Sequence, residues 1–313
     1  SSVIERNQRN SNMPSSSANS GRYVPEKHLI GMVHVGALPS SPLCRRTIGE
    51  IVKQAAAEAV LLAKHGFDAV MIENMHDAPY VHGRQRPVVT AAMTACGLAV
   101  QEALEPMRRA GVGGGKGGKK GRAIPLGVQV LSGGNHEALS VALACGAAFI
   151  RCENFVFAHV GDEGLMAQAE AGELLRYRRE IGAEAIAVFT DLKKKHASHA
   201  ITGDVSIGET AEAAAFFGSD GFIVTGTATG KPVEASDLHA VRAAADGLNC
   251  PRPVLVGSGV TAGTVGTLLE KADGLIVGSS IKREGRWFNP PDARRVERLA
   301  SAAKSFKSSK NRE

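Results

Sequence analysis

Three acidic residues follow short apolar runs and are the first candidates for chemistry: Glu73 closes AVMIE, Glu153 follows FIRC, and Asp191 follows IAVFT. Carboxyl groups with apolar neighbours have shifted pKa values, and such groups are frequent general acids and bases. We therefore predict Asp191, Glu73 and Glu153 as catalytic residues, with Asp191 as the leading candidate. The alternative is a buried ion network, because Arg151 lies two residues before Glu153 and on the same face of a strand.

Uncharged and basic side chains beside these acids predict contacts to a substrate. Amides at such positions can orient hydroxyl groups, and an arginine can bind an anion. A further basic pair, Lys195 and His196, follows Asp191, although a lysine run is more often a solvated loop. The predicted substrate-binding residues are His34, Asn74, Gln129, Arg151, Asn154, His196 and Thr225.

Two segments of glycine and serine, GSG at 257–259 and GSS at 278–280, predict a phosphate site. Small residues let backbone N–H groups approach an anion closely, and the two segments lie about one strand–helix unit apart. The alternative is a pair of tight turns without a ligand. The predicted phosphate-binding residues are Gly257, Ser258, Gly259, Gly278 and Ser279.

The glycine–lysine segment GVGGGKGGKKG at 111–121 is a weaker phosphate signal. It lacks the G-x-x-x-x-G-K-[ST] register and has no strand leading into a helix. We interpret it as a flexible insertion.

Eight β-rich apolar runs must position these residues. Each run is unbroken rather than alternating, as expected for parallel strands buried on both faces. Ala-rich helical stretches separate them; the clearest are 48–65, after the capping box of Thr47 and Glu50, 135–145, with Asn135 as N-cap, 165–181 and 207–217. The runs are 29–35, 69–73, 124–130, 148–153, 185–190, 221–225, 254–257 and 274–277.

Eight strand–helix repeats predict an α/β fold, a single (β/α)8 TIM barrel over residues 28–303, with the Gly/Lys-rich insertion inside it. In such a barrel the chemistry lies at the carboxyl ends of the strands, where all the residues above would meet. Residues 1–27 are expected to be a disordered tail or a transit-peptide remnant, and 304–313 a basic tail.

The charge distribution argues against a nucleic-acid partner. The net charge is +6, but residues 1–27, 111–122 and 304–313 carry +2, +4 and +3, so the rest of the chain is net negative. The basic residues are therefore not on the folded body, and aromatics are only 4%. The basic tails leave open a peripheral association with a membrane or a membrane complex.

The remaining composition limits the setting of the protein. No uninterrupted apolar run has the roughly 18 residues of a membrane span. Five cysteines without a CxxC pair predict no metal site and a reducing compartment. We expect a cytoplasmic or organellar protein, mitochondrial or plastid, that is not secreted. No cofactor is predicted, and a homo-oligomer is left open.

Several segments together resemble the BtpA/SgcQ family over about residues 28–300. They are HVGALPSSP at 34–42, GFDAVMIENMHDAPY at 66–80, RCENF at 151–155, DLKKKHASH at 191–199, GSGVT at 257–261 and GSSIKREGRWFNPPDARRV at 278–296. The resemblance implies a TIM barrel of the ribulose-phosphate-binding type. It implies two functions: a thylakoid-associated factor for photosystem I accumulation in cyanobacterial members, and a sugar-metabolism enzyme in others.

From the strand ends we predict an enzyme acting on a phosphorylated sugar or nucleoside-like metabolite. Lyase, isomerase and glycosidic cleavage by paired carboxylates all stay open. The alternative is a non-catalytic biogenesis or stability factor for a membrane complex such as photosystem I.

Overall fold

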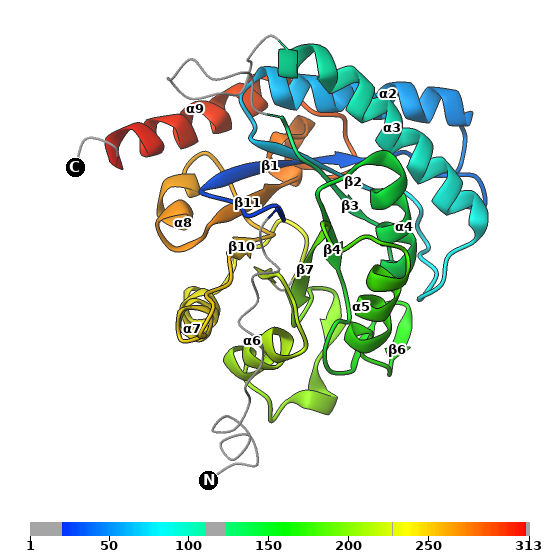
Figure 1. The fold of residues 1–313 in the computed structure, drawn as a ribbon. Helices are drawn as coiled ribbons and strands as arrows, with labels where there is room; N and C mark the ends of the chain where they lie inside the picture. Colours follow the sequence, from blue (N-terminus) through cyan, green and yellow to red (C-terminus); the bar gives the residue numbers. More distant parts are fainter. Residues whose placement is uncertain (1–20, 110–122, 227, 311–313) are drawn as a thin grey trace.

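The computed structural model describes residues 21–109, 123–226 and 228–310. Eight parallel strands form a closed barrel in the order β1-β11-β10-β9-β7-β4-β3-β2, and helices surround it (Figure 1). The predicted (β/α)8 architecture is confirmed. The barrel strands are β1 (His28–His34), β2 (Ala69–Glu73), β3 (Leu126–Gln129), β4 (Phe149–Cys152), β7 (Ala187–Leu192), β9 (Gly221–Val224), β10 (Val254–Val256) and β11 (Gly274–Val277).

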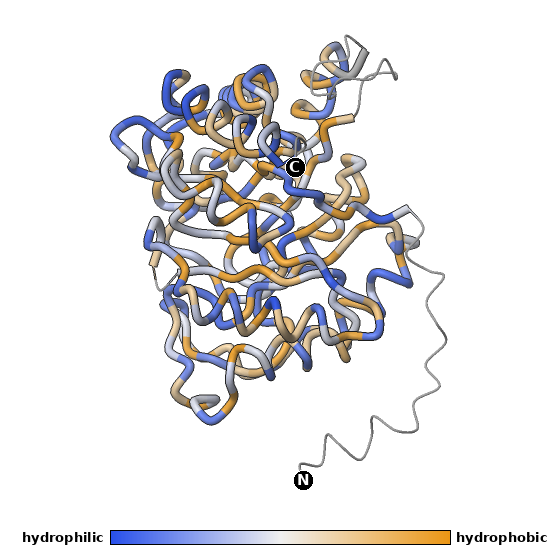
Figure 2. Tube along the Cα trace, turned by 90° about the vertical axis from the view of Figure 1, so that its left-hand side faces the viewer, coloured by the Kyte–Doolittle hydropathy of each residue, from blue (hydrophilic) through white to orange (hydrophobic). Residues whose placement is uncertain are grey.

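One helix follows each strand along the chain. Hydrophobic and hydrophilic residues alternate along these outer helices (Figure 2), so that one face of each helix can pack on the barrel. The helices are α2 (Ile48–Lys64), α3 (Pro87–Arg109), α4 (Asn135–Cys145), α5 (Ala171–Glu180), α6 (Ile207–Phe216), α7 (Ala235–Asp246), α8 (Val265–Lys271) and α9 (Ala293–Lys310).

The predicted helix ends are set by local chemistry. The capping box of Thr47 and Glu50 is present at the start of α2. Gly146 has φ 69° at the end of α4, the left-handed conformation that glycine adopts without steric cost. The N-cap of α4 was predicted wrongly: it is Gly134, because the Asn135 side chain instead contacts Glu153 and Glu170.

The predicted helix 165–181 was also wrong in its first part. Residues Gly164–Met166 form strand β6, which pairs with β5 (His159–Gly161), and β5 pairs with β8 (Ala197–Ser198). Met166 is buried while Leu165 is 57% exposed, which is the two-residue period of a strand. This small sheet lies outside the barrel sheet.

Both ends of the described chain are more ordered than predicted. Residues 21–27 are not part of a disordered tail: Arg22 pairs with Asp220 at 2.7 Å, and Tyr23 stacks on Phe149. Residues 304–310 are the last turns of α9, where Lys307 pairs with Asp68 at 2.8 Å. The predicted insertion 111–121 lies outside the described residues.

Helix α3 is, over Pro87–Met107, long and apolar enough to cross a membrane by length and composition, which the search for uninterrupted apolar runs had missed. Its Val, Ala, Leu, Met and Cys residues keep the average hydropathy high, while Thr and Gly residues interrupt the apolar run. In the structure α3 packs between α2 and α4 in the helical ring.

The hydrophobic core has two layers. The larger one lies between the strands and the helices, and the smaller one fills the lumen of the barrel. Tyr23 packs against the lumen cluster at the amino ends of the strands, where its ring stacks on Phe149, the first residue of β4. The lumen residues are Ile30, Met32, Ala69, Met71, Phe149, Ala187, Phe189, Ile223, Leu255 and Ile276.

Candidate active site

Strand alternation carries the predicted site residues to the mouth of the barrel. Side chains two residues apart share a face of a strand, so the second residue after a lumen residue also points inward. Glu73 follows Met71 in this way, and Asp191 follows Phe189. The same relation holds for His34, Arg151, Thr225, Gly257 and Gly278.

A cavity of about 270 Å³ opens at this end of the strands. It joins residues that are far apart in the sequence. Among them are eight of the predicted site residues, namely His34, Glu73, Arg151, Gly257, Ser258, Gly259, Gly278 and Ser279. It also includes Lys195, Thr229, Gly230 and Arg295, which are not among the predicted site residues. Arg295 comes from α9, and no local pattern marks it.

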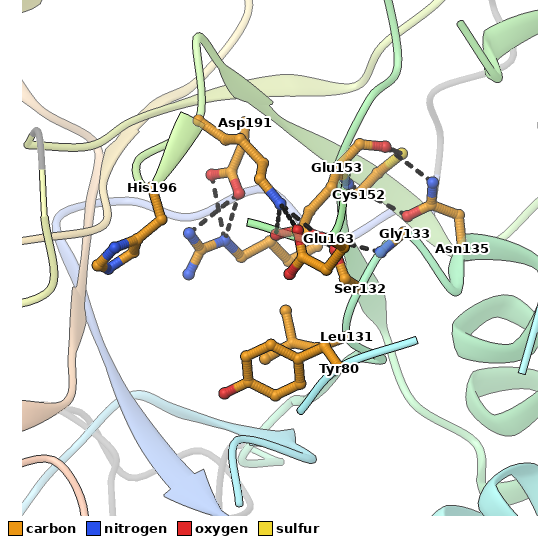
Figure 3. Close-up of polar contacts among 12 residues, drawn as sticks. Tyr80, Leu131, Ser132, Gly133, Asn135, Cys152, Glu153, Glu163, Asp191 and His196 are labelled. Atoms are coloured by element: carbon orange, nitrogen blue, oxygen red, sulfur yellow. Dashed lines mark hydrogen bonds and ion pairs between the residues drawn. The ribbon is translucent and has the colours of Figure 1, made fainter. Parts of the chain in front are cut away.

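Asp191 and Arg151 form a buried ion pair across neighbouring strands (Figure 3). Arg151 Nε donates to both Asp191 oxygens at 3.1 Å, and Arg151 Nη2 lies 3.0 Å from Asp191 Oδ2. The predicted partner for Arg151, Glu153, is not the one it contacts. Such a bidentate ion pair fixes the orientation of both side chains and engages both oxygens of the Asp191 carboxylate.

Glu153 is held by a separate group of donors (Figure 3). Its Oε2 accepts from the Gly133 amide at 2.8 Å, and its Oε1 lies 3.4 Å from Lys194 Nζ. Burial raises the pKa of Glu153, but Lys194, the Gly133 amide and Arg151 outweigh it, so the pKa lies below its usual value. Glu153 is therefore a permanent carboxylate, and it is not among the residues that line the cavity.

Glu73 has a different environment, because no cation lies within ion-pair distance of it other than the imidazole of His34, at 3.7 Å, among the residues described. Burial raises the pKa of Glu73, and the more distant charges of Arg151 and Lys195 oppose this without cancelling it. Burial, helped by Lys282, puts the pKa of His34 well below its usual value.

The tautomer of His34 follows from its other contact. His34 Nδ1 lies 2.9 Å from the Trp287 carbonyl, which can only accept, so Nδ1 carries the proton. The neutral Nε2 then faces Glu73 with a free lone pair. Glu73 and His34 are thus placed so that a proton can be held between them at the edge of the cavity.

The glycine–serine loops after β10 and β11 line the cavity. In the described chain, the amides of Gly259 and Ser279 have no intramolecular acceptor. A Cβ at Gly259 would lie 2.3 Å from the Pro232 backbone, and its φ is +70°, so only glycine fits there. Ser258 does not face an anion with its hydroxyl, which donates to the Lys231 carbonyl at 2.7 Å and holds the neighbouring loop.

Five predicted substrate contacts lie away from the cavity lining. Asn74 binds the Leu131 backbone through both ends of its amide, at 2.6 and 3.2 Å, and Asn154 donates to the Gln168 carbonyl at 2.6 Å. His196 is exposed and contacts Thr229. The geometry gives these three side chains structural partners, although Asn154 Oδ1 is buried without a hydrogen-bond partner among the described residues.

Gln129 and Thr225, the other two, are buried near the mouth. Gln129 Oε1 and Thr225 Oγ1 have no hydrogen-bond partner among the described residues. A buried polar atom without a partner costs free energy, so a ligand or water is expected to satisfy each one. In the described ranges no group of three or more His, Cys, Asp or Glu side chains is arranged to hold a metal ion.

The fold and the site together define a (β/α)8 barrel with a polar cavity at the carboxyl ends of its strands. The sequence model of the protein family described as the BtpA family matches residues 25–111 and 119–305 of this chain. The chain therefore belongs to the BtpA family, as the resemblance in its sequence had implied. The short break in the match falls inside the predicted insertion.

Curated relatives cover almost the whole chain. An uncharacterised mitochondrial protein of Caenorhabditis elegans is 38% identical over 89% of this chain and 94% of its own length. The photosystem I biogenesis protein BtpA of Synechocystis is 33% identical over 88% of this chain and 87% of its own. An uncharacterised protein of Thermococcus kodakarensis is 33% identical over 90% of this chain and 97% of its own length.

Solved structures agree on the fold at low identity. A Rubisco-like protein from Rhodopseudomonas palustris has a TM-score of 0.55 and 13% identity, covering 91% of this chain and 66% of that one. A phosphoribosyl anthranilate isomerase from Thermus thermophilus has a TM-score of 0.51 and 12% identity, covering 89% of this chain and 99% of that one. These likenesses confirm the expected (β/α)8 barrel as the fold.

Proposed function

We propose that this chain is an enzyme that acts on a phosphorylated small metabolite, with lyase or isomerase chemistry. One observation carries the proposal: a single cavity joins the amide-rich loops after β10 and β11 to Glu73, His34, Arg151 and Lys195. Phosphate binding and proton transfer would then occur within one substrate length of each other.

The charges around the cavity favour an anion. Arg151, Lys195 and Arg295 line it, whereas Glu73 is the one carboxylate among its described lining residues. The free amides of Gly259 and Ser279 would bind phosphate oxygens, as the loops after the seventh and eighth strands do in many barrels.

The acid–base chemistry belongs to Glu73 in this proposal. Asp191 and Glu153 form ion pairs with Arg151 and Lys194, and in this proposal they position these cations, although burial raises the pKa of Asp191 more than Arg151 lowers it. Glycosidic cleavage by paired carboxylates has no support, because it needs two free carboxyl groups on opposite sides of the bond. A proton donor beside cationic side chains fits a lyase or an isomerase acting next to a carbonyl.

Substitution of Ser279 tests the phosphate site. Ser279→Asp places a carboxylate beside the free amides, whereas Ser258→Asp would also disturb the loop that Ser258 holds. Repulsion between charges about 4 Å apart costs about 1 kcal/mol even in water, so affinity should fall at least about fivefold. Isothermal titration with inorganic phosphate and with ribulose 5-phosphate measures this.

The matched control is Ser305→Asp, an exposed position in the last turns of α9, where Lys307 pairs with Asp68 just before β2. It adds the same charge at the amino ends of the strands, away from the mouth, and should bind like the parent protein. Equal affinities for the parent, Ser279→Asp and Ser305→Asp would remove the phosphate site from the loops.

A second candidate function is a biogenesis factor for a membrane complex, and the name of the Synechocystis relative favours it. A scaffold does not require a proton donor, unpaired cations and free amides in one cavity. If phosphorylated compounds do not bind while the protein associates with such a complex, this second function is the better one.

A further inference from the structure

The side chains of the three lysines at 193–195 lie in three different environments. Lys193 Nζ donates to the Val205 carbonyl, and Lys194 Nζ lies 3.4 Å from Glu153 and 3.8 Å from Glu163. Lys195 lines the mouth cavity instead. Among the described residues, its amino group has no hydrogen-bond acceptor and no carboxylate at ion-pair distance. The loop therefore places one unengaged amine in the proposed substrate cavity.

The acids near Lys195 contact other groups, which explains why Lys195 has no carboxylate partner. Arg151 forms an ion pair with Asp191 through three contacts of 3.0 to 3.1 Å. Glu153 pairs with Lys194 and accepts a hydrogen bond from the Gly133 amide. Glu73 shares the cavity with Lys195, but it lies outside ion-pair distance and faces His34.

The electrostatics of the cavity shift the protonation equilibrium of this amine toward its neutral form. Burial lowers the pKa of Lys195, and the positive charge of Arg151 lowers it further, while Glu73, Asp191 and Glu153 oppose the change without reversing it. A desolvated lysine next to another cation is the environment that makes a lysine nucleophilic.

We propose that Lys195 is a nucleophile that forms an imine with the carbonyl carbon of a phosphorylated ketone or aldehyde held in the mouth cavity. This rests on the proposed function and names its substrate class: a sugar phosphate with an open-chain carbonyl group. The geometry behind it is the unengaged amine, the proton donor Glu73 and the free loop amides in one cavity.

The step balances with groups that the site contains. The lone pair of the neutral amine attacks the carbonyl carbon, and the carbonyl oxygen takes a proton from protonated Glu73. The nitrogen returns one proton to the Glu73 carboxylate, giving a carbinolamine. A second proton transfer from Glu73 lets the hydroxyl leave as water, and the nitrogen lone pair forms the C=N bond of an iminium ion. No oxidant or reductant is needed.

Borohydride trapping tests this step directly. The parent protein is incubated with dihydroxyacetone phosphate or ribulose 5-phosphate and then reduced with sodium borohydride. We expect a stable secondary amine on Lys195, seen by peptide mass spectrometry as the mass of the probe less water plus two hydrogens. Glycerol 3-phosphate, which carries the phosphate but no carbonyl, should bind without leaving an adduct.

Two variants at the same position make the result specific. Lys195→Arg keeps the positive charge and cannot form the imine, so it should lose the adduct. Lys195→Met removes the charge as well and should also weaken phosphate binding. Lys193→Ala is the matched control, because Lys193 lies in the same run but contacts the Val205 carbonyl, and its adduct yield should equal that of the parent.

The outcomes separate this proposal from the proposed function. If titration shows that the carbonyl probes bind but no adduct forms, or the adduct lies on another lysine, Lys195 is an electrostatic contact and the imine is excluded. If neither carbonyl probe nor inorganic phosphate binds, the proposed function fails and this proposal fails with it.

Discussion

The three acids and Lys195 near the mouth of the barrel differ in their partners. Asp191 and Glu153 form ion pairs with Arg151 and Lys194. In the described chain Glu73 lies within ion-pair distance only of the His34 imidazole, and Lys195 has no carboxylate at that distance. The sequence placed all three acids at strand ends, but it ranked Asp191 first and treated Lys195 as part of a solvated run. Pairing depends on contacts between strands up to 40 residues apart, which the local sequence does not reveal.

The raised pKa of Glu73 predicts a pH-dependent stability difference. An acid whose folded pKa is above its unfolded value stabilises the fold at low pH, and this contribution is lost as the pH rises through the folded pKa. Glu73→Gln removes the titration. Its melting temperature relative to the parent should therefore be higher at about pH 7 than at about pH 4.

Differential scanning fluorimetry across this range measures the effect. Glu212→Gln, at an exposed position on α6, controls for the loss of one surface charge and should show a much flatter difference. A Glu73→Gln difference that stays constant with pH, or that reverses, would mean that Glu73 is an ordinary solvated carboxylate.

At the scale of elements, unbroken apolar runs predicted all eight barrel strands, with ends shifted by one or two residues. The errors occurred where long-range contacts decide the structure. Residues 164–166 pair with β5 instead of starting α5, and residues 21–27 pack on the barrel because Tyr23 reaches Phe149. The local sequence pattern of neither segment indicates its partner, which is β5 for residues 164–166 and Phe149 for Tyr23.

The Tyr23 contact predicts that the segment before β1 stabilises the barrel. The Tyr23 ring stacks on Phe149 with centroids 4.9 Å apart, and its hydroxyl lies 2.7 Å from His28 Nδ1. Tyr23→Ala should cost about 1 to 3 kcal/mol of unfolding free energy, because a partly buried aromatic ring is lost. Tyr23→Phe keeps the stack and should cost about 1 kcal/mol.

Urea unfolding of the two variants measures these costs. Phosphate affinity should not change in either, since Tyr23 packs at the opposite end of the lumen from the mouth cavity. An unchanged midpoint for Tyr23→Ala would show that the segment rests on the barrel without stabilising it.

At the scale of the whole molecule, the barrel and the location of its mouth cavity were predictable together. Eight repeats specify the architecture, and the architecture puts the carboxyl ends of all strands around one mouth. The cavity joins loops that span the sequence from His34 to Arg295. What the sequence could not provide is the balance of charge there, because that depends on which acids are neutralised by neighbouring cations.

A crystal structure with ribulose 5-phosphate bound tests the central claim most directly. We expect the phosphate within hydrogen-bond distance of the Gly259 and Ser279 amides, and the carbonyl carbon turned toward Lys195 and Glu73. A phosphate bound elsewhere on the molecule, or an empty mouth under conditions where titration shows saturation, would contradict the proposed site.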